Sequence, residues 1–521
     1  MNVEKRILIA SLLSAFLLAW YSHTIGMRTG NLLPRAPQQT EDISSQHPED
    51  PSAIFKKDKD KQEDAVSIET EQVKIEVGRQ SSAIRKVVLK KFSDSSGTAP
   101  TLGTEFPVFH LHVGEENRAW RLIEQDATRL TFKSEESTGV IYQLSYTIDA
   151  ETPKIYVQLS KLGQNLSDHQ EKPLFLTSTW HRVDELPSRF NPLEAILWDP
   201  GRKGAYKRYI SPLKRPIDVP RGTPIVSLTE RYFCQSLRVD QGLFDSMRFI
   251  QLDPQSLGFY GTSAQWSQTK DVSSQFSATL YFGPRDYFYL KKAGFETAFH
   301  IGPLGRIGLI FLVILGWIQS IVRNYGVAVI IFSVLVTCAT APFTLLSFKS
   351  MKKMQQLKPS VDKIMARYKE NPQKGNQEVF ALYKENHVSP LSGCLPMLMQ
   401  MPIFIAIFQA VPHFIALRGE SFLWIKDLSL PDRFFHLSFS LPILGEYLNL
   451  LPIVMAAAMF FQTKMSQQQM PSSEANPSSQ IMSGPVMPIL FCIMFYNIQS
   501  ALVLYWLTNS LISVAWYRLS T

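Results

Sequence analysis

The sequence predicts a multi-pass α-helical membrane protein with six spans and an exported all-β sandwich domain between the first span and the remaining five. Three observations lead to this fold class. An apolar run lies near the N-terminus, short alternating strand patterns fill residues 66–286, and long apolar stretches follow Gly302. Polar and apolar residues are therefore segregated along the chain, as in a membrane protein with one large water-exposed domain.

The composition excludes several other classes of protein. Charged residues make up 19% of the 521 residues, below the about 25% of a typical globular chain. Four cysteines are too few for a disulfide scaffold, and they form neither a metal cluster nor a CxxC motif. There is no HExxH, no GxxxxGKS/T, no GxSxG and no Rossmann glycine pattern after a strand. We therefore predict no catalytic residue, metal or cofactor, hence no enzyme, and no sequence-specific recognition of nucleic acid.

The N-terminal apolar run, Ile7–Tyr21, reaches spanning length when it is extended to Met27. It is either an uncleaved anchor or a cleaved signal peptide. The bulky Trp20 stands where a cleavage site needs small residues, which favours the anchor, residues 1–30. In both cases the two basic residues before the run stay in the cytosol and the following chain is exported.

The exported part consists of a linker and a folded domain. Residues 31–64 are rich in Pro, Gln, Ser, Asp and Lys, which predicts a disordered linker because such a composition cannot bury a core. Residues 65–290 show period-two alternation, as at Val73, Ile75 and Val77, with turn signals between the runs. They predict a β-sandwich that is large enough to bury its own core.

Charge orients the C-terminal part of the chain. Residues 348–393 hold nine basic and four acidic residues, and this excess marks the cytosolic side. Apolar residues at helical spacing make the segment an amphipathic helical hairpin, which is either a solvated connector or a docking element for polypeptide or ribosome. Its basic charge would also favour anionic lipid. The basic residues of interest are Lys352, Lys353, Lys358, Lys363, Arg367 and Lys369.

Only one crossing fits between the exported domain and the cytosolic hairpin. We therefore assign residues 303–323, in which the apolar stretch Leu309–Ile318 lies between Arg306 and Arg323, to an amphipathic helix in the membrane interface. The last apolar run is too long for one helix, and the polar residues at 496–500 predict two short spans with a turn between them. The remaining segments are expected at 324–347 (span), 394–418 (span), 419–446 (exported loop), 447–463 (span), 464–480 (cytosolic loop) and 481–521 (two spans).

The interiors of the spans after Gly326 contain no Asp, Glu, Lys or Arg, which weighs against an ion-coupled transporter. They do contain neutral polar residues and several prolines. Such residues either join helices to each other or line a hydrated cavity that is open to lipid, and the residues alone leave both interpretations open.

One segment of the sequence favours the hydrated cavity over simple helix–helix contacts. Residues 392–408, SGCLPMLMQMPIFIAIF, closely resemble the signature of YidC-type membrane-protein insertases, the group that includes the mitochondrial Oxa and chloroplast Alb relatives. The resemblance covers about residues 303–519 strongly and the outer domain, in its Gram-negative form, more weakly. Supporting matches are Asn324–Gly326, Ser350–Met354, Leu382–Lys384, Leu423–Leu428, Met459–Phe461, Leu502–Trp506 with Asn509, and, in the outer domain, Val66–Val77, Arg231–Phe233 and Leu280–Pro284.

The resemblance implies an insertase that works without nucleotide hydrolysis, through a five-helix core whose groove is open to cytosol and lipid and closed toward the outside. It implies a bacterial inner-membrane protein with both termini in the cytoplasm, whose partners are nascent membrane proteins, membrane lipids and the Sec translocon. Ribosome contact would rest on the hairpin, because no basic tail follows Arg518. A hydrated groove shortens the roughly 30 Å of hydrocarbon that a polar tail must cross.

The same resemblance suggests which residues line the groove. The family usually carries an Arg in the first core span, and the corresponding position here is Thr337. We therefore expect a hydrophilic but uncharged groove, with an adaptable apolar wall beside it. The candidate groove residues are Thr337, Thr340, Gln400, Met401, Phe404, Tyr505, Trp506, Thr508 and Asn509.

Two alternative functions come from other classes. The protein could be a membrane-anchored binding module whose exported sandwich does the work, or a small-solute transporter.

Overall fold

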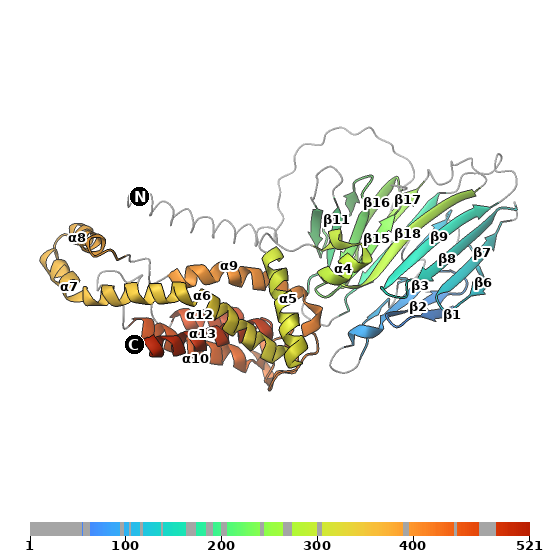
Figure 1. Ribbon diagram of the computed structural model, residues 1–521. Coiled ribbons are helices and arrows are strands. Elements are labelled where there is room, and N and C mark those ends of the chain that lie inside the picture. The colour runs from blue at the N-terminus through green and yellow to red at the C-terminus, as the bar shows by residue number, and fades with distance from the viewer. Residues whose placement is uncertain are drawn as a thin grey trace, which may run out of the picture.

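The computed structural model describes residues 55, 63–93, 98–103, 106–114, 118–136, 139–162, 173–183, 191–198, 206–239, 244–263, 273–299, 305–388, 395–441, 445–467 and 486–520. The N-terminal anchor expected at 1–30 lies outside these residues, as does the 31–64 linker apart from residues 55, 63 and 64. Figure 1 shows a body of strands beside a bundle of helices, with the short helix α4 and the helix α5 where the two meet.

The strand body is a sandwich of two nine-stranded sheets, which confirms the predicted all-β domain. All strand pairs are antiparallel, and both sheets contribute side chains to one large core between them. The first sheet has the order β1-β2-β3-β5-β10-β17-β16-β13 with β4 beside β3, and its strands are β1 (Ala65–Glu69), β2 (Val73–Gly78), β3 (Ile84–Leu89), β4 (Thr101–Leu102), β5 (Phe109–Val113), β10 (Leu174–His181), β13 (Ile217–Val219), β16 (Ser246–Asp253) and β17 (Ser256–Ser263).

The second sheet has the order β12-β11-β14-β15-β18-β9-β8-β7-β6, and its strands are β6 (Arg121–Gln125), β7 (Arg129–Glu135), β8 (Ile141–Ile148), β9 (Lys154–Leu162), β11 (Glu194–Trp198), β12 (Tyr206–Ile210), β14 (Ile225–Thr229), β15 (Phe233–Val239) and β18 (Ser273–Pro284). Alternation explains the edge strand β1, in which Val66 and Ile68 are buried between exposed neighbours. All five residues of β14 are buried, because α4 (Tyr287–Ala293) and η3 (Glu296–Ala298) pack near its other face.

The chain then enters the helical bundle (Figure 1), whose elements are α5 (Gly305–Val322), α6 (Tyr325–Gln356), α7 (Lys358–Arg367), α8 (Pro372–Glu385), α9 (Leu395–Ala410), η5 (Val411–His413), η6 (Ile415–Leu417), β19 (Phe435–Leu441), β20 (Gly445–Leu448), α10 (Leu450–Gln467), α12 (Val486–Phe495) and α13 (Ser500–Ser520). Within the described residues, Gly305–Val322 and Tyr325–Pro342 are long and apolar enough to cross a membrane, and α10, α12 and α13 hold shorter apolar stretches. The break between α12 and α13 falls at the polar residues 496–499, where the sequence predicted a turn.

Helix α6 joins the expected span to the start of the hairpin segment. The span was expected at 324–347 and helical spacing was expected in the segment after it, and the structure makes residues 325–356 one uninterrupted helix. Residues 348–356 contain only residues that tolerate a helix, rich in Lys, Met and Gln, and neither Gly nor Pro. The helix ends at Leu357, and Pro359 then occupies the first turn of α7, a position in which proline is favoured.

Helix α5 runs across the end of the bundle that faces the sandwich (Figure 1). It packs against α6 and α9 through Leu312, Leu315 and Ile318. The closest approach is at Gly308, where a Cβ would lie 2.6 Å from Ala410 Cβ and would also meet the carbonyl oxygen of Ala406. A side chain at this position would therefore push α5 away from α9.

This close approach predicts a contrast between two glycines of the same helix. Gly308→Ala should destabilise the bundle by about 1–3 kcal/mol, because it overpacks backbone that cannot yield. Gly316→Ala should instead be neutral or stabilising by up to about 1 kcal/mol, since a Cβ there meets nothing within 4 Å and alanine favours the helix. Thermal unfolding in detergent measures both variants, and equal midpoints would contradict the α5–α9 packing.

Candidate functional site

Four of the predicted groove residues lie together where α6, α9 and α13 meet. Thr337 Oγ1 on α6 donates to its own helix at Ser333 O, 2.8 Å away, and also contacts Asn509 Oδ1 on α13. One turn before Asn509 on α13, the hydroxyl of Tyr505 accepts from Gln400 Nε2 of α9 at 2.5 Å. Thr337, Gln400, Tyr505 and Asn509, which we call the polar seam, therefore join three helices through neutral hydrogen bonds.

Asn509 links the two halves of the seam. Its Nδ2 donates to Tyr505 O at 3.1 Å, one turn earlier on α13. Thr337, Gln400 and Asn509 are half-buried, whereas Tyr505 is buried. Half-buried neutral side chains can replace a hydrogen bond to each other with one to water or to a bound polar group, and this exchange costs little free energy.

Two further predicted groove residues bond to their own helices. Thr508 is buried, and its Oγ1 donates to Leu504 O at 2.8 Å. Thr340 Oγ1 donates to Val336 O at 3.0 Å and to the carbonyl oxygen of the seam residue Thr337 at 3.1 Å. Hydroxyls on helices often bond to the preceding turn in this way. Met401 is half-buried on α9 next to Gln400.

The predicted Phe404 and Trp506 lie in an aromatic cluster that joins α9, α12 and α13. Their ring centroids are 5.0 Å apart with the edge of one ring toward the face of the other. Phe491 and Phe495 of α12 complete the cluster, at 5.5 and 5.6 Å from Trp506. Sequence reasoning missed these two phenylalanines, although their spacing of four residues on an apolar helix was a usable signal. Together the rings form a wide apolar wall that also includes the exposed Phe408, whose ring is tilted against that of Phe404 with the centroids 5.6 Å apart.

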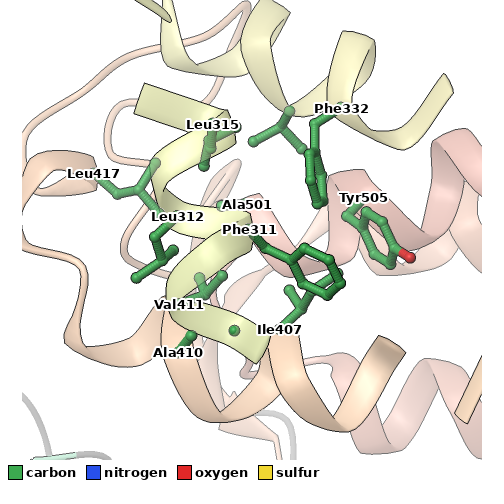
Figure 2. A pocket seen from close by; sticks show the side chains of 12 residues that line it. Phe311, Leu312, Leu315, Phe332, Ile407, Ala410, Val411, Leu417, Ala501 and Tyr505 are labelled. Carbon is green, nitrogen blue, oxygen red and sulfur yellow. The ribbon is translucent and has the colours of Figure 1, made fainter. Parts of the chain in front are cut away.

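A small cavity of about 20 Å³ lies between α5, α6, α9 and α13. Figure 2 shows Phe311 of α5 on the side of Phe332 and Tyr505, and Leu312 of α5 on the side of Leu417 and Val411. The side chains around it are otherwise apolar, and apolar cavities of this kind stay dry. The cavity therefore belongs to the packing of α5 on the bundle and is distinct from the hydrophilic groove that the sequence suggested.

The predicted basic hairpin consists of α7 and α8, which follow the long helix α6. Its own small core contains Met354, Val361 and Tyr383. Asn371 caps α8, because its Oδ1 accepts from Lys374 N at 3.2 Å. The basic residues point mostly outward: Lys358 is half-buried, and the exposed ones are Lys352, Lys353, Lys363, Arg367 and Lys369.

The sandwich is joined to the end of the bundle that faces it by residues to which the sequence analysis assigned no structural role. In the turn between β14 and β15, Arg231 donates to Pro412 O at 3.3 Å and to Ser429 O at 3.2 Å. The hydroxyl of Tyr232 donates to Ser429 O at 3.3 Å and accepts from Gln499 Nε2 at 3.3 Å. Gln499 lies in the turn that starts α13, so the sandwich holds the helix that carries Tyr505 and Asn509.

A buried ion pair lies behind this junction. Arg285 Nη1 is 3.0 Å from Glu194 Oε2, and the two side chains are 3% and 2% exposed. Arg208 pairs with the same carboxylate from a more exposed position. Burial by itself would raise the pKa of Glu194, but the two arginines outweigh it and hold that pKa below its ordinary value. Glu194 is therefore ionised at neutral pH, and Arg285 has a counterion.

Among the residues that the structure describes, no group of three or more His, Cys, Asp or Glu is arranged to hold a metal ion.

Comparison with known proteins identifies the relatives of the helical part. A family model described as "60Kd inner membrane protein" matches residues 317–519. The chain is 40% identical over 253 residues to the "Membrane protein insertase YidC" of Endomicrobium trichonymphae, which covers 48% of this chain and 46% of that protein. It is 38% identical over 244 residues to the protein of the same name from Chlorobaculum tepidum, covering 45% and 40%. The alignments thus span less than half the length of these curated relatives.

Among solved structures, the chain is similar to an active YidC insertase with its first transmembrane domain resolved, with a TM-score of 0.39 and 16% identity over 87% of this chain and 92% of that one. A galactose mutarotase-like protein from Lactobacillus casei matches with a TM-score of 0.33 and 8% identity, over 42% of this chain and 100% of that one.

Proposed function

We propose that the chain, whose residues 317–519 match the model of the 60Kd inner membrane protein family, is a YidC-type insertase that inserts and folds integral proteins of a bacterial inner membrane. The proposal assigns nascent membrane proteins as substrates, with insertion either by this protein alone or together with the Sec translocon.

The observation that carries the proposal is the polar seam beside the aromatic cluster. A nascent span with a short polar tail must pass about 30 Å of hydrocarbon. Gln400 and Asn509 offer uncharged hydrogen-bond partners to the tail within the bundle, which lowers the cost of leaving water. The flat rings of Phe404 and Trp506 offer an apolar surface to the span, which then moves sideways into lipid because burial there is favourable.

The proposed topology has six spans, with both termini in the cytoplasm. Helices α6, α9, α10, α12 and α13 are the five core spans, and α5 lies in the outer interface. Two observations support the place of α5: it runs across the end of the bundle in Figure 1, and a crossing there would put the basic hairpin outside. Cysteine labelling that placed Gln319 and Lys353 on the same side of the membrane would contradict it.

The hairpin is the proposed docking element on the cytosolic side. Its exposed basic residues, among them Lys363, Arg367 and Lys369, are suited to the phosphates of ribosomal RNA or of anionic lipid. The short hydrophobic core keeps these charges on the outside of a defined two-helix unit.

The direct test is depletion of the protein in its own cell, followed by an insertion assay of small phage-coat-like proteins. Insertion should fail on depletion and return with the wild-type chain. Liposomes that contain the purified protein should not take up small solutes, whereas liposomes that contain a transporter would.

Deletion of residues 70–285 separates the insertase from a membrane-anchored binding module, because only the module would lose its function. The deletion also removes Arg231 and Tyr232, which hold the start of α13. Tyr232→Phe is therefore the matched control: it loses the hydroxyl that joins Ser429 and Gln499 but keeps the whole sandwich. If the deletion and Tyr232→Phe impair insertion equally, the junction and not a sandwich ligand explains the loss.

A further inference from the structure

The loop after α9 contains a tight turn whose tip is apolar and projects outward. Phe422 and Ile425 exchange two backbone hydrogen bonds, each 2.9 Å long, which leave Leu423 and Trp424 at the tip. Leu423 is 74% exposed, the largest exposed fraction among the exposed large hydrophobic residues that the structure describes. Trp424 is also exposed, and its indole N–H donates to Asp432 at 3.3 Å.

Leu423 occupies a backbone conformation that is unfavourable for leucine. Leu423 has φ +52, a left-handed conformation that glycine adopts without strain and leucine rarely adopts. A strained residue persists where the surrounding structure holds it, and such residues gather at functional positions. An exposed leucine contributes little to folding, so its presence at the tip points to a contact outside the chain.

Contacts with the first residues of α6 hold the turn in place. The side chain of Phe422 packs directly over Gly326, where a Cβ would clash with its ring. Asn324 caps α6 by accepting from Val327 N at 3.0 Å and also donates to Ser421 O at 3.4 Å. The tip is therefore fixed at the outer end of the first core helix, next to the end of α5.

The surroundings of the tip have the composition of a membrane-interface anchor. Phe434 and Phe435 are exposed shortly after Asp432, the residue that Trp424 contacts. We call Leu423, Trp424, Phe434 and Phe435 the outer apolar patch. Within residues 421–435 the exposed charged side chains are the basic Lys426 and Arg433, whereas Asp432 is buried and Asp427 is half-buried. Aromatic residues flanked by exposed basic charge are typical of the boundary between acyl chains and anionic headgroups.

We propose that the outer apolar patch inserts into the outer leaflet of the bilayer, with Leu423 and the aromatic rings among the upper acyl chains and with Lys426 and Arg433 at lipid phosphates. The proposal rests on the topology given above. According to this proposal, the loop fixes how deeply the outer end of the bundle lies in the bilayer. It does so through its own contacts with lipid, in addition to any that α5 makes.

Site-specific labelling in lipid vesicles tests the proposal on the full chain. The four native cysteines are first replaced, and Leu423→Cys or Phe434→Cys is then labelled with a polarity-sensitive fluorophore. Leu335→Cys, an exposed position within α6, is the positive control, and Ile123→Cys, an exposed apolar position on β6, is the negative control. Quenching is measured with nitroxides placed shallow or deep on the acyl chains, and with aqueous iodide.

The expected result is that labels at 423 and 434 are quenched several-fold more by the shallow nitroxide than the label at 123, and that iodide reaches them poorly. Vesicles with phosphatidylglycerol should give stronger shallow quenching than purely zwitterionic ones. If lipid nitroxides quench the label at position 335, but the labels at positions 423 and 434 are quenched no more than the label at position 123, the proposal for the outer apolar patch fails. The proposed topology would then still stand.

The remaining outcomes are also decisive. If the label at 335 is not quenched by lipid either, the topology itself is wrong. If labels at 423 and 434 are shielded from both iodide and lipid nitroxides, and dilution of the protein exposes them, a second copy of the chain covers the patch instead of lipid. Cysteine keeps the same backbone strain as leucine at position 423, so the turn is preserved in the labelled chain.

Discussion

Glu194→Ala is expected to cost the β-sandwich about 3–5 kcal/mol of folding free energy. The substitution leaves Arg285 buried at 3% exposure without its counterion. A charge stranded in this way costs more than the ion pair contributes, because water cannot reach it. Glu151→Ala is the control: its partner Lys292 and Glu151 itself are exposed, so about 0–1 kcal/mol is expected.

Cys234 provides the measurement. It is fully buried in the sandwich, and burial raises the pKa of its thiol to about 12, so it reacts only when the domain opens. With the other cysteines replaced, labelling of Cys234 across a urea series reports the stability of the domain within the full chain. Equal midpoints for Glu194→Ala and Glu151→Ala would mean that the buried pair does not support the fold.

The same pair gives a pH dependence with a defined sign. Burial opposes ionisation of Glu194, but Arg285 and Arg208 hold its pKa below the ordinary 4.5. A carboxyl whose pKa is lower in the folded than in the unfolded chain contributes its full stabilisation above the ordinary value and loses it as the pH falls. The stability difference between wild type and Glu194→Ala should therefore be constant near neutral pH and shrink below pH 4.5. A difference that grows on acidification would contradict this assignment.

Thr337→Arg is expected to fold and to favour substrates with acidic tails. Thr337 is half-buried on α6 and faces Asn509, so an arginine there would reach the polar seam and not a dry core. A cation near a substrate carboxylate is worth about 1 kcal/mol in water-like surroundings, or about fivefold per Asp or Glu. Wild type, with its uncharged seam, should pass weakly charged tails more easily than strongly acidic ones.

The measurement compares insertion of paired substrates that differ only in the number of Asp and Glu in the tail. Thr337→Val is the matched control, because it keeps the shape of threonine and loses the hydroxyl. We expect it to lower the folding free energy by about 1 kcal/mol and to leave the preference for substrate tails unchanged. Degradation of the Arg variant would show that the position is dry packing, since a buried, unhydrated arginine is costly. A stable Arg variant with unchanged preference would show that charge at this position does not select substrates.

Local patterns in the sequence predicted much of the architecture. The alternation that buries Val66 and Ile68 predicted strands, and the polar residues at 496–499 predicted the break between α12 and α13. The sequence predicted helical spacing on both sides of residue 347 but did not show that the two parts form one continuous helix, because the expected span boundary followed the end of the apolar run. Helix propensity continues across that boundary, and the backbone follows propensity until Leu357.

Contacts between distant residues could not be predicted in the same way. Thr337 and Asn509 are 172 residues apart, and Tyr232 and Gln499 are 267 apart. The sequence marked Tyr232 only as part of the family match Arg231–Phe233, because its contacts depend on the turn that faces it. The candidate groove residues likewise formed one set in the sequence, whereas the fold divides them between the polar seam, the aromatic cluster and hydroxyls that bond to their own helix.

The length of α6 has a mechanical consequence. Its 32 residues extend about 48 Å, whereas a bilayer core is about 30 Å thick, so in the proposed topology α6 would carry the basic hairpin beyond the hydrocarbon on a helical arm. Pro342 lies inside this helix and removes one backbone hydrogen bond, which makes it the natural point of bending. From there the arm to Gln356 is about 21 Å, and a bend of about 10° displaces its end by about 4 Å. If the hairpin binds a polypeptide or ribosome as proposed, a force on that partner would be transmitted along this arm to the part of α6 next to Thr337.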